Sequence, residues 1–365
     1  MHSIHFHKGR GALSNVGSRF DAFQREALAP EQQDWPGGDT ADTDGSDATR
    51  PKTVLVQKMA RSIISRNQSP DIGFGQSINP YQGCEHGCVY CYARPSHAYL
   101  GLSPGLDFET QIFAKTNAAA LLRAELSKAS YVPGLIVLGA NTDPYQPIER
   151  KLGITRAVLE VLAECQLPVG IITKNALVTR DLDILAPMAA RGLLRVCISL
   201  TTQDHGLARK LDPRASSPTS RLQAMQTLAQ AGVPVAVFAS PMIPAINDVE
   251  LEKIPQAAAG AGARYASYVL LRLPLEVRDL FVQWLQTHFP LRAEHVMHRV
   301  QQMRGGKDYD AHFAQRMKGQ GLFAELLAQR FQIALKRYGL QKLPSEVDVS
   351  QFRAPSVGAA QGQLF

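Results

Sequence analysis

Short apolar runs alternate with amphipathic segments from about residue 53 onward. Because the runs are continuously apolar, they are typical of parallel strands that are covered on both faces. Each run is followed by a segment with helical periodicity. Six right-handed strand–helix units predict an α/β fold with a curved sheet or a partial (β/α)6 barrel. The expected strands lie near 76–79, 134–139, 169–174, 194–200, 233–240 and 265–273. The expected helices lie near 149–166, 179–191, 217–231, 249–262 and 275–288.

Local sequence signals predict the ends of some of these elements and add further short ones. Ser217, Pro218 and Gly232 predict the start and end of the helix over 217–231. Residues 107–115 read as a further short strand, and Asn117 predicts the N-cap of a helix over 117–128. A last helix near 322–338 has apolar residues on one face, namely Leu322, Phe323, Leu326, Leu327, Phe331 and Leu335.

Composition divides the chain into four parts. Residues 29–52 are poor in large apolar side chains and rich in Asp, so 1–52 is predicted to be a mostly disordered N-terminal segment. Residues 53–290 form the expected (β/α)6 core. A basic helical extension over 291–350 and a flexible tail over 351–365 follow.

Charge and apolar content indicate which partners and which cellular compartment to expect for this protein. The net charge is +7, and residues 291–342 hold ten Lys and Arg against four acids. That segment is either a solvated helical face or a surface for nucleic acid. No apolar run is long enough for a membrane span, and the N-terminus lacks the apolar core of a signal peptide. With an odd number of cysteines, five, these features favour the reducing cytoplasm.

The cysteines are unevenly placed. Cys84, Cys88 and Cys91 form a C-x3-C-x2-C loop, whereas Cys165 and Cys197 lie in apolar contexts typical of buried thiols. Three thiolates from one loop suit a metal centre with one open position. The loop follows the first expected strand, so it lies at the edge of the sheet where ligands bind. Alternatively, His86 or His97 completes a Cys3His zinc site, although we expect His86 to be exposed on the loop.

This loop, with Tyr90 before its last cysteine and six strand–helix units after it, resembles the radical S-adenosylmethionine (radical SAM) enzymes. The runs 79–84, 91–94 and 141–147 are similar to the branch that contains spore photoproduct lyase. Together with Met303–Lys307, a Met-Arg-Gly-Gly-Lys stretch, they resemble its PA-type subgroup. The resemblance covers about residues 70–345.

The resemblance implies a cofactor pair. A 4Fe-4S cluster would be held by Cys84, Cys88 and Cys91, and its fourth iron would bind the amino and carboxylate groups of S-adenosylmethionine. One electron, from a donor such as flavodoxin or ferredoxin, would cleave the sulfonium to a 5′-deoxyadenosyl radical that abstracts a substrate hydrogen. Thiolates hold iron at low potential, and a partial barrel would shield the radical from solvent.

The resemblance also implies cofactor contacts. Tyr90 would lie beside the adenine, Thr142 and Asp143 near the methionyl amino group, Lys174 near the carboxylate, and Ser199 near the ribose. Each residue is alternatively a polar strand-end or turn residue that is satisfied locally. Further candidates, for the carboxylate or the adenine, are Arg214, Arg221, Asn247 and the run 241–244.

One position departs from the lyase pattern. Photoproduct lyases place a hydrogen-donating cysteine just after the second strand, where this chain has Asn141. The same hydrogen-return chemistry is therefore not predicted. The leading hypothesis is a radical SAM enzyme with a lyase-type or nucleic-acid-related reaction. The alternative is a metal- or cluster-containing nucleic-acid-binding protein without turnover.

Overall fold

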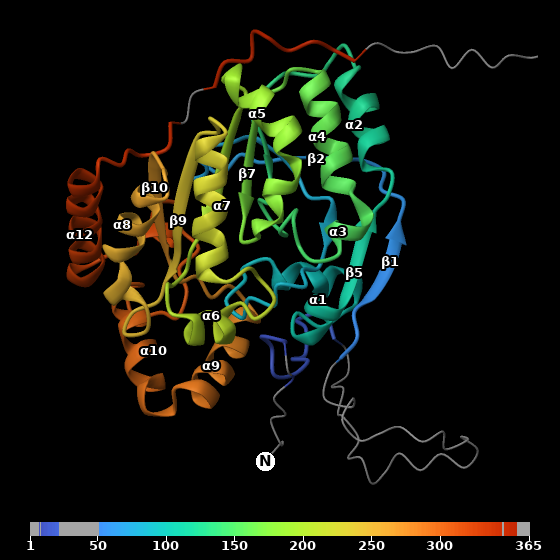
Figure 1. Ribbon diagram of the computed structural model, residues 1–365. Coiled ribbons are helices and arrows are strands. Elements are labelled where there is room, and N and C mark those ends of the chain that lie inside the picture. The colour runs from blue at the N-terminus through green and yellow to red at the C-terminus, as the bar shows by residue number, and fades with distance from the viewer. Residues whose placement is uncertain (1–6, 8, 22–50, 345–346, 356–365) are drawn as a thin grey trace, which may run out of the picture.

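A seven-stranded sheet forms the centre of the computed structural model, which describes residues 7, 9–21, 51–344 and 347–355 (Figure 1). Its strand order is β10-β9-β8-β7-β6-β3-β2. The six strands from β3 to β10 in this order run parallel, and β2 pairs antiparallel with β3. The predicted partial barrel is confirmed. The strands are β2 (Ile64–Arg66), β3 (Gln76–Ile78), β6 (Ile136–Leu138), β7 (Val169–Thr173), β8 (Leu194–Ser199), β9 (Val235–Met242) and β10 (Tyr265–Leu270).

Helices cover the sheet, and α2, α4, α5 and α7 lie in front of it in Figure 1. The core lies between these layers, because strand residues such as Ile171 and Val196 and helix residues such as Leu162 and Leu228 are fully buried. Each such side chain contributes about 1.5–3 kcal/mol when it leaves water. The helices that follow the strands are α2 (Ala118–Leu126), α3 (Glu149–Leu152), α4 (Ile154–Glu164), α5 (Leu182–Ala190), α6 (His205–Leu211), α7 (Pro218–Gln230), α8 (Lys253–Gly260) and α9 (Val277–His288).

A second sheet braces the cysteine loop. Residues 107–115 are only half strand: α1 (Leu106–Thr110) precedes β5 (Gln111–Lys115). β5 pairs parallel with β1 (Val54–Lys58) and antiparallel with β4 (Tyr81–Gln82). Because β4 ends two residues before Cys84, this small sheet fixes where the loop begins.

The two predicted helix caps have different outcomes. The Ser217 hydroxyl accepts a hydrogen bond from Ser220 N at 3.2 Å, as expected for an N-cap. Asn117 takes the predicted N-cap position of α2, but its side chain makes no capping hydrogen bond. Its side-chain amide instead donates to Ala60 O and accepts from Ala60 N, both at 2.9 Å. The local sequence around Asn117 does not predict a partner that is so distant in the chain.

The C-terminal part is helical, and α12 (Leu322–Tyr338) packs against α8 at the outer edge of the sheet (Figure 1). The predicted apolar face is partly wrong, because Leu322 and Leu326 are exposed. Ala324 and Ala334 lie on the buried face with Leu327, Phe331 and Leu335, so that face is rotated relative to the predicted one. The remaining elements are η2 (Arg94–Leu100), η3 (Ala176–Asp181), η4 (Asp248–Glu250), η5 (Pro290–Arg292), α10 (Ala293–Gln302) and α11 (Gln315–Lys318).

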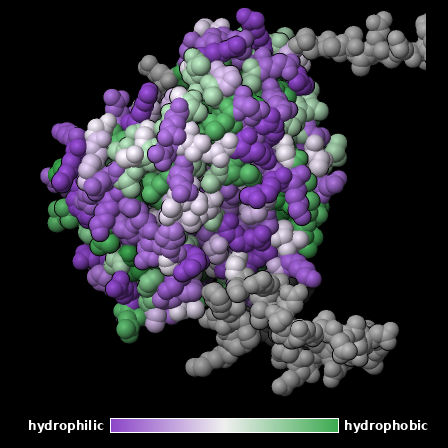
Figure 2. Space-filling view, in the orientation of Figure 1, coloured by the Kyte–Doolittle hydropathy of each residue, from purple (hydrophilic) through white to green (hydrophobic). Residues whose placement is uncertain are grey.

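Segments near both ends of the chain lie outside the residues that the structure describes. The disorder expected for 1–52 falls mainly on residues outside the described part, and so does the tail beyond residue 355. Within the described part of that tail, Phe352 packs on Tyr131 and Arg353 N donates to Cys165 O at 2.9 Å. Polar residues cover most of the face in Figure 2. None of the helices in the described residues combines enough length and apolarity to cross a bilayer.

Candidate active site

The cysteine loop is held by backbone contacts from three directions. Cys84 N donates to Phe108 O at 2.9 Å, Val89 N donates to Leu211 O at 3.1 Å, and Arg94 Nε donates to Cys88 O at 2.9 Å. Cys84 and Cys88 are buried and Cys91 is half-buried. The backbone is tightly packed: Gly83 has a φ of +79°, and a Cβ there would lie 2.8 Å from Gln111 O. The loop is therefore built to fix the positions of its thiols.

The three thiols influence one another electrostatically. Burial raises the pKa of Cys84, and Asp143, Cys88 and Cys91 raise it further. Burial likewise raises the pKa of Cys88 and of Cys91, although the Lys174 ammonium opposes the shift at both. Metal ligation needs the thiolate form, which burial disfavours here, so a positively charged iron centre would offset the free-energy cost of deprotonating the three thiols. Three thiolates are the donors that iron–sulfur clusters use, and the residues present fit such a group.

The two histidines are engaged elsewhere. His86 is only 1% exposed, so its expected exposure is wrong. Its Nδ1 lies 3.3 Å from Asp143 Oδ2, and its Nε2 lies 3.2 Å from Asn175 Nδ2. His97 Nε2 lies 3.0 Å from Gln111 O. Among the described residues, no group of three or more His, Cys, Asp or Glu side chains is arranged to hold a metal ion, and this applies to the three loop cysteines as well as to a Cys3His set.

Thr142 and Asp143, which follow β6, connect the loop to the sheet. The Thr142 hydroxyl donates to Tyr81 O at 2.8 Å. Asp143 accepts from Lys174 N and from the Thr173 hydroxyl, both at 2.7 Å. Burial alone would raise the pKa of Asp143, but His86 and these hydrogen bonds hold it below the usual value. Both side chains already have partners in the chain, and contact with the methionyl amino group stays a prediction.

A buried polar centre lies beside the cysteine loop, at the ends of β7 and β8. Lys174 Nζ lies 3.3 Å from Thr201 Oγ1, 3.9 Å from Asp212 Oδ2 and 5.4 Å from the centre of the Tyr90 ring. The Tyr90 hydroxyl lies 3.1 Å from Thr201 Oγ1. An ammonium group held over an aromatic face is suited to an anionic ligand group. We call Tyr90, Lys174, Thr201 and Asp212 the lysine centre.

Thr201 and Asp212 were not expected at this site, since neither belongs to a sequence motif. Burial would raise the pKa of Asp212, but Arg221 and Lys174 hold it below its ordinary value, so Asp212 is a carboxylate. Arg221 Nη2 lies 2.7 Å from Asp212 Oδ2, and its Nη1 donates to Ser199 O at 3.0 Å. Arg221 thus positions Asp212 and the end of β8, where Ser199 lies.

The other arginine and asparagine candidates also hold the framework. Arg214 Nη2 pairs with Glu85 Oε1 at 3.0 Å, and Arg214 N donates to His86 O at 3.2 Å. Asn247 is fully buried and donates to Thr201 O at 2.7 Å and to Pro241 O at 2.9 Å. Asn141 N donates to Asn79 Oδ1 at 2.9 Å. These three residues therefore connect the loops that surround the lysine centre.

The N-terminal segment contacts the cysteine loop, which the sequence analysis did not predict. Glu109 is fully buried and accepts from Gly11 N at 2.9 Å and Ala12 N at 2.8 Å. The same carboxylate pairs with Arg94, also fully buried, whose Nε donates to Cys88 O. Arg10 Nη1 donates to Glu109 O at 2.7 Å. We call residues 10–12 the N-terminal clasp.

Replacing Gly11 with alanine is expected to release the clasp. A Cβ at this position would lie 1.7 Å from Gly87 O, so one backbone segment must move. We expect a loss of about 1–3 kcal/mol in unfolding free energy, as for other overpacked sites, together with faster proteolysis within residues 1–21. The control is Gly73→Ala, where nothing lies within 4 Å of the added Cβ. Equal protease resistance in both variants would contradict a packed clasp.

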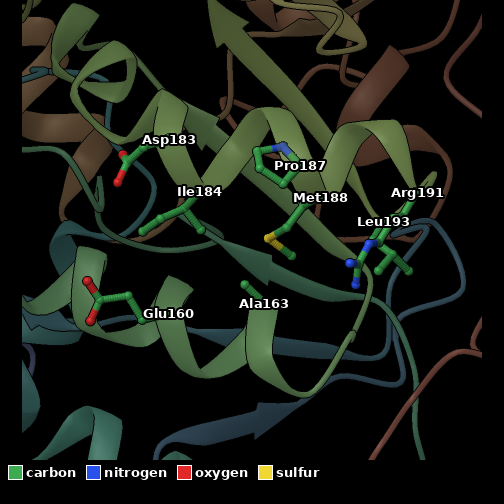
Figure 3. A pocket seen from close by; sticks show the side chains of 8 residues that line it. All are labelled: Glu160, Ala163, Asp183, Ile184, Pro187, Met188, Arg191 and Leu193. Carbon is green, nitrogen blue, oxygen red and sulfur yellow. The ribbon is translucent and has the colours of Figure 1, made fainter.

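A cavity between α4 and α5, of about 340 Å³, lies elsewhere (Figure 3). Glu160 and Ala163 of α4 face Ile184, Met188 and the rest of α5 across it, and no residue of the cysteine loop or the lysine centre lines it. The chemistry-bearing residues are at the ends of the strands instead. We therefore place the candidate active site at the cysteine loop and the lysine centre.

Comparison with known proteins identifies the family of the matched residues. Residues 78–257 match the family model of the radical SAM superfamily. The chain thus contains a radical SAM domain. The matched range contains the cysteine loop and all of the lysine centre.

Curated relatives of this radical SAM protein are uncharacterized. A protein of Mycobacterium tuberculosis (strain H37Rv) is 36% identical over 219 residues, which covers 60% of this chain and 64% of that protein. A protein of Methanocaldococcus jannaschii is 28% identical over 199 residues, 54% of this chain and 71% of that one. The chain thus spans less than two thirds of the length of the mycobacterial relative.

Among solved structures, spore photoproduct lyase complexed with dinucleoside spore photoproduct has a TM-score of 0.57 and 15% identity. A mutant of the same lyase with bound AdoMet and the dinucleoside has a TM-score of 0.52 and 16% identity. Each match covers 78% of this chain and 80% of the lyase. At such identity the likeness shows a common fold for the radical SAM chain and the lyase.

Proposed function

We propose that this chain is a radical SAM enzyme that holds a 4Fe-4S cluster with Cys84, Cys88 and Cys91. The observation that carries the proposal is the position of these thiols, in one buried loop beside the lysine centre. When bound, the cluster and S-adenosylmethionine supply one-electron cleavage of the sulfonium, and the resulting 5′-deoxyadenosyl radical removes a hydrogen atom from the substrate.

The residues of the chain would bind and orient the cofactor. Lys174 presents its ammonium for the methionyl carboxylate, while Thr201 and Asp212 hold that ammonium over the Tyr90 ring. The body of Tyr90 would meet the adenine, and Ser199 at the end of β8 would meet the ribose. Burial of the loop keeps water from a reactive radical.

The proposal is tested by anaerobic reconstitution with iron, sulfide and reductant. We expect a brown protein with about four irons per chain that converts S-adenosylmethionine to 5′-deoxyadenosine when reduced. The measurements are iron content, visible absorbance and chromatography of the nucleoside. A colourless protein without bound iron would overturn the proposal.

For the substrate, we propose a nucleic acid or a nucleotide-containing molecule and a lyase-type reaction. The support is the basic segment 291–342 and the fold shared with a lyase that binds a dinucleoside. Three of its ten cations act internally, because Arg304 is buried and donates to Leu271 O, Arg316 pairs with Asp71, and Arg330 pairs with Glu252. Seven remain: Arg292, Arg299, Lys307, Lys318, Lys336, Arg337 and Lys342.

This substrate class predicts binding of single-stranded DNA or RNA that weakens with salt. With up to seven cations available, we expect the affinity to fall at least about tenfold between 50 and 200 mM salt. Fluorescence anisotropy with labelled oligonucleotides measures it. Negligible affinity at low salt would remove the proposal for this substrate class and leave the cofactor chemistry untouched. Binding without 5′-deoxyadenosine formation would favour the alternative, a nucleic-acid-binding protein without turnover.

A further inference from the structure

A basic cavity of about 480 Å³ adjoins the cysteine loop at Glu85. The N-terminal clasp, the start of β1, the loop itself and α3 contribute to its wall. Its charged lining residues in the described chain are four cations and one acid, Arg10, Lys52, Lys151, Arg214 and Glu85. No member of the lysine centre, and no residue of the segment 291–342, lines it. The cavity is therefore distinct from the lysine centre and from the proposed nucleic-acid surface, although it shares Glu85 with the cysteine loop.

The charges in this basic cavity are not balanced. Arg10 Nη2 and Arg214 Nη1 both donate to Thr53 Oγ1, at 3.1 and 3.3 Å, so two guanidinium groups lie close together. Glu85 is the single carboxylate, and it pairs with Arg214. Lys52 and Lys151 are exposed and have no carboxylate partner among the described residues. A concave wall with excess positive charge focuses the field and attracts an anionic group.

Two paths connect the basic cavity to the proposed cluster ligands. Glu85 follows Cys84 directly, and its backbone N donates to Gln146 Oε1 at 2.9 Å. Arg10 reaches the loop through Glu109, whose partner Arg94 donates to Cys88 O. An occupant of the cavity thus reaches the cysteine loop without entering the lysine centre. A substrate must enter where the radical forms, whereas an electron can reach the cluster through the wall that the loop shares with this cavity.

We infer that the basic cavity is the docking surface for an acidic one-electron donor protein of the flavodoxin or ferredoxin class. Carboxylates of the donor would lie against Lys52 and Lys151. One electron leaves the donor and is taken up by the cluster, and no bond forms or breaks. This inference rests on the proposed function, because only a cluster enzyme needs such a donor. Charge complementarity chiefly accelerates encounter, so the effect is on the rate of reduction.

The test reverses the two exposed charges in a Lys52→Glu/Lys151→Glu variant. Lys128→Glu/Lys253→Glu is the control, since these lysines are also exposed but lie outside the basic cavity. Reconstituted proteins are mixed anaerobically with reduced flavodoxin, and bleaching of the cluster absorbance is followed by stopped flow. We expect the rate for the cavity variant to fall at least about tenfold at low salt and to lose most of its salt dependence. Reduction by dithionite and iron content should stay at the level of the control.

Other outcomes separate the hypotheses. An unchanged flavodoxin rate with unchanged salt dependence overturns the inference. Weaker binding of oligonucleotides with an unchanged flavodoxin rate also overturns it and assigns the basic cavity to nucleic acid. If the unsubstituted protein assembles no cluster, the proposed function fails. Calorimetry of oxidised flavodoxin with the metal-free proteins still tests the surface, and equal affinity in both variants rejects it.

Discussion

Replacing Cys88 with alanine is expected to lower iron incorporation sharply and to cut 5′-deoxyadenosine formation at least about 100-fold, since even outer partners of metal ligands cost 10–100-fold. The variant keeps the backbone contact from Arg94 to the carbonyl of residue 88 but lacks the thiol. Two thiolates of the loop then remain for the cluster. Iron content, visible absorbance and nucleoside chromatography after reconstitution measure the effect.

Cys165→Ala is the matched control. Cys165 is also fully buried, but it follows α4 and lies outside the cysteine loop. We expect this variant to retain its iron and its 5′-deoxyadenosine formation. Normal cofactor content in Cys88→Ala, or an equal loss in both variants, would argue against the three-cysteine assignment. Nucleic-acid binding that survives Cys88→Ala, with no turnover in either protein, would support the non-enzymatic alternative.

Replacing Glu109 with alanine is expected to destabilise the protein by about 3–5 kcal/mol, the cost of leaving one member of a buried ion pair without its partner. Arg94 and Glu109 are both fully buried, and the carboxylate also accepts the backbone N–H groups of Gly11 and Ala12. The substitution therefore leaves a buried guanidinium and two donors without their acceptor. Urea unfolding followed by circular dichroism measures the change.

The control for this prediction is Glu164→Ala, which breaks the Arg123–Glu164 pair. Both side chains of that pair are 46% exposed, so we expect a loss below about 1 kcal/mol. Equal losses for the two variants would show that the Arg94–Glu109 pair does not hold the loop. A large loss for Glu109→Ala alone would show that the clasp helps to stabilise the cysteine loop. In that case Gly11→Ala should also lower the unfolding free energy.

The cysteine loop has two neighbours with different chemistry. One is the lysine centre, where Lys174 opposes the rise that burial causes in the pKa of Cys88. The other is the basic cavity, which the loop meets at Glu85, the partner of Arg214. Under the proposed function, cofactor and substrate use the first and the electron donor uses the second. The stopped-flow comparison separates the two, because dithionite needs no protein docking surface.

The sequence by itself determined the strands, most helices and the three-cysteine loop. The continuous apolar runs of the strands, the helical periodicity of the segments between them and caps such as Ser217 are local properties of the chain. The spacing of Cys84, Cys88 and Cys91 is likewise contained in eight consecutive residues. These features were readable without any knowledge of distant contacts.

Only the tertiary structure decided which polar groups meet. His86 is buried against Asp143, Asn117 pairs with Ala60 in place of capping a helix, and Glu109 receives the N-terminal clasp. Asp212 joins Lys174, which follows β7, and Arg221, which lies in α7. A buried polar side chain takes its partner from whatever the fold brings near, and that partner lies tens of residues away in the chain. The local sequence pattern therefore does not predict these polar partners, although it does predict which strands and helices are buried.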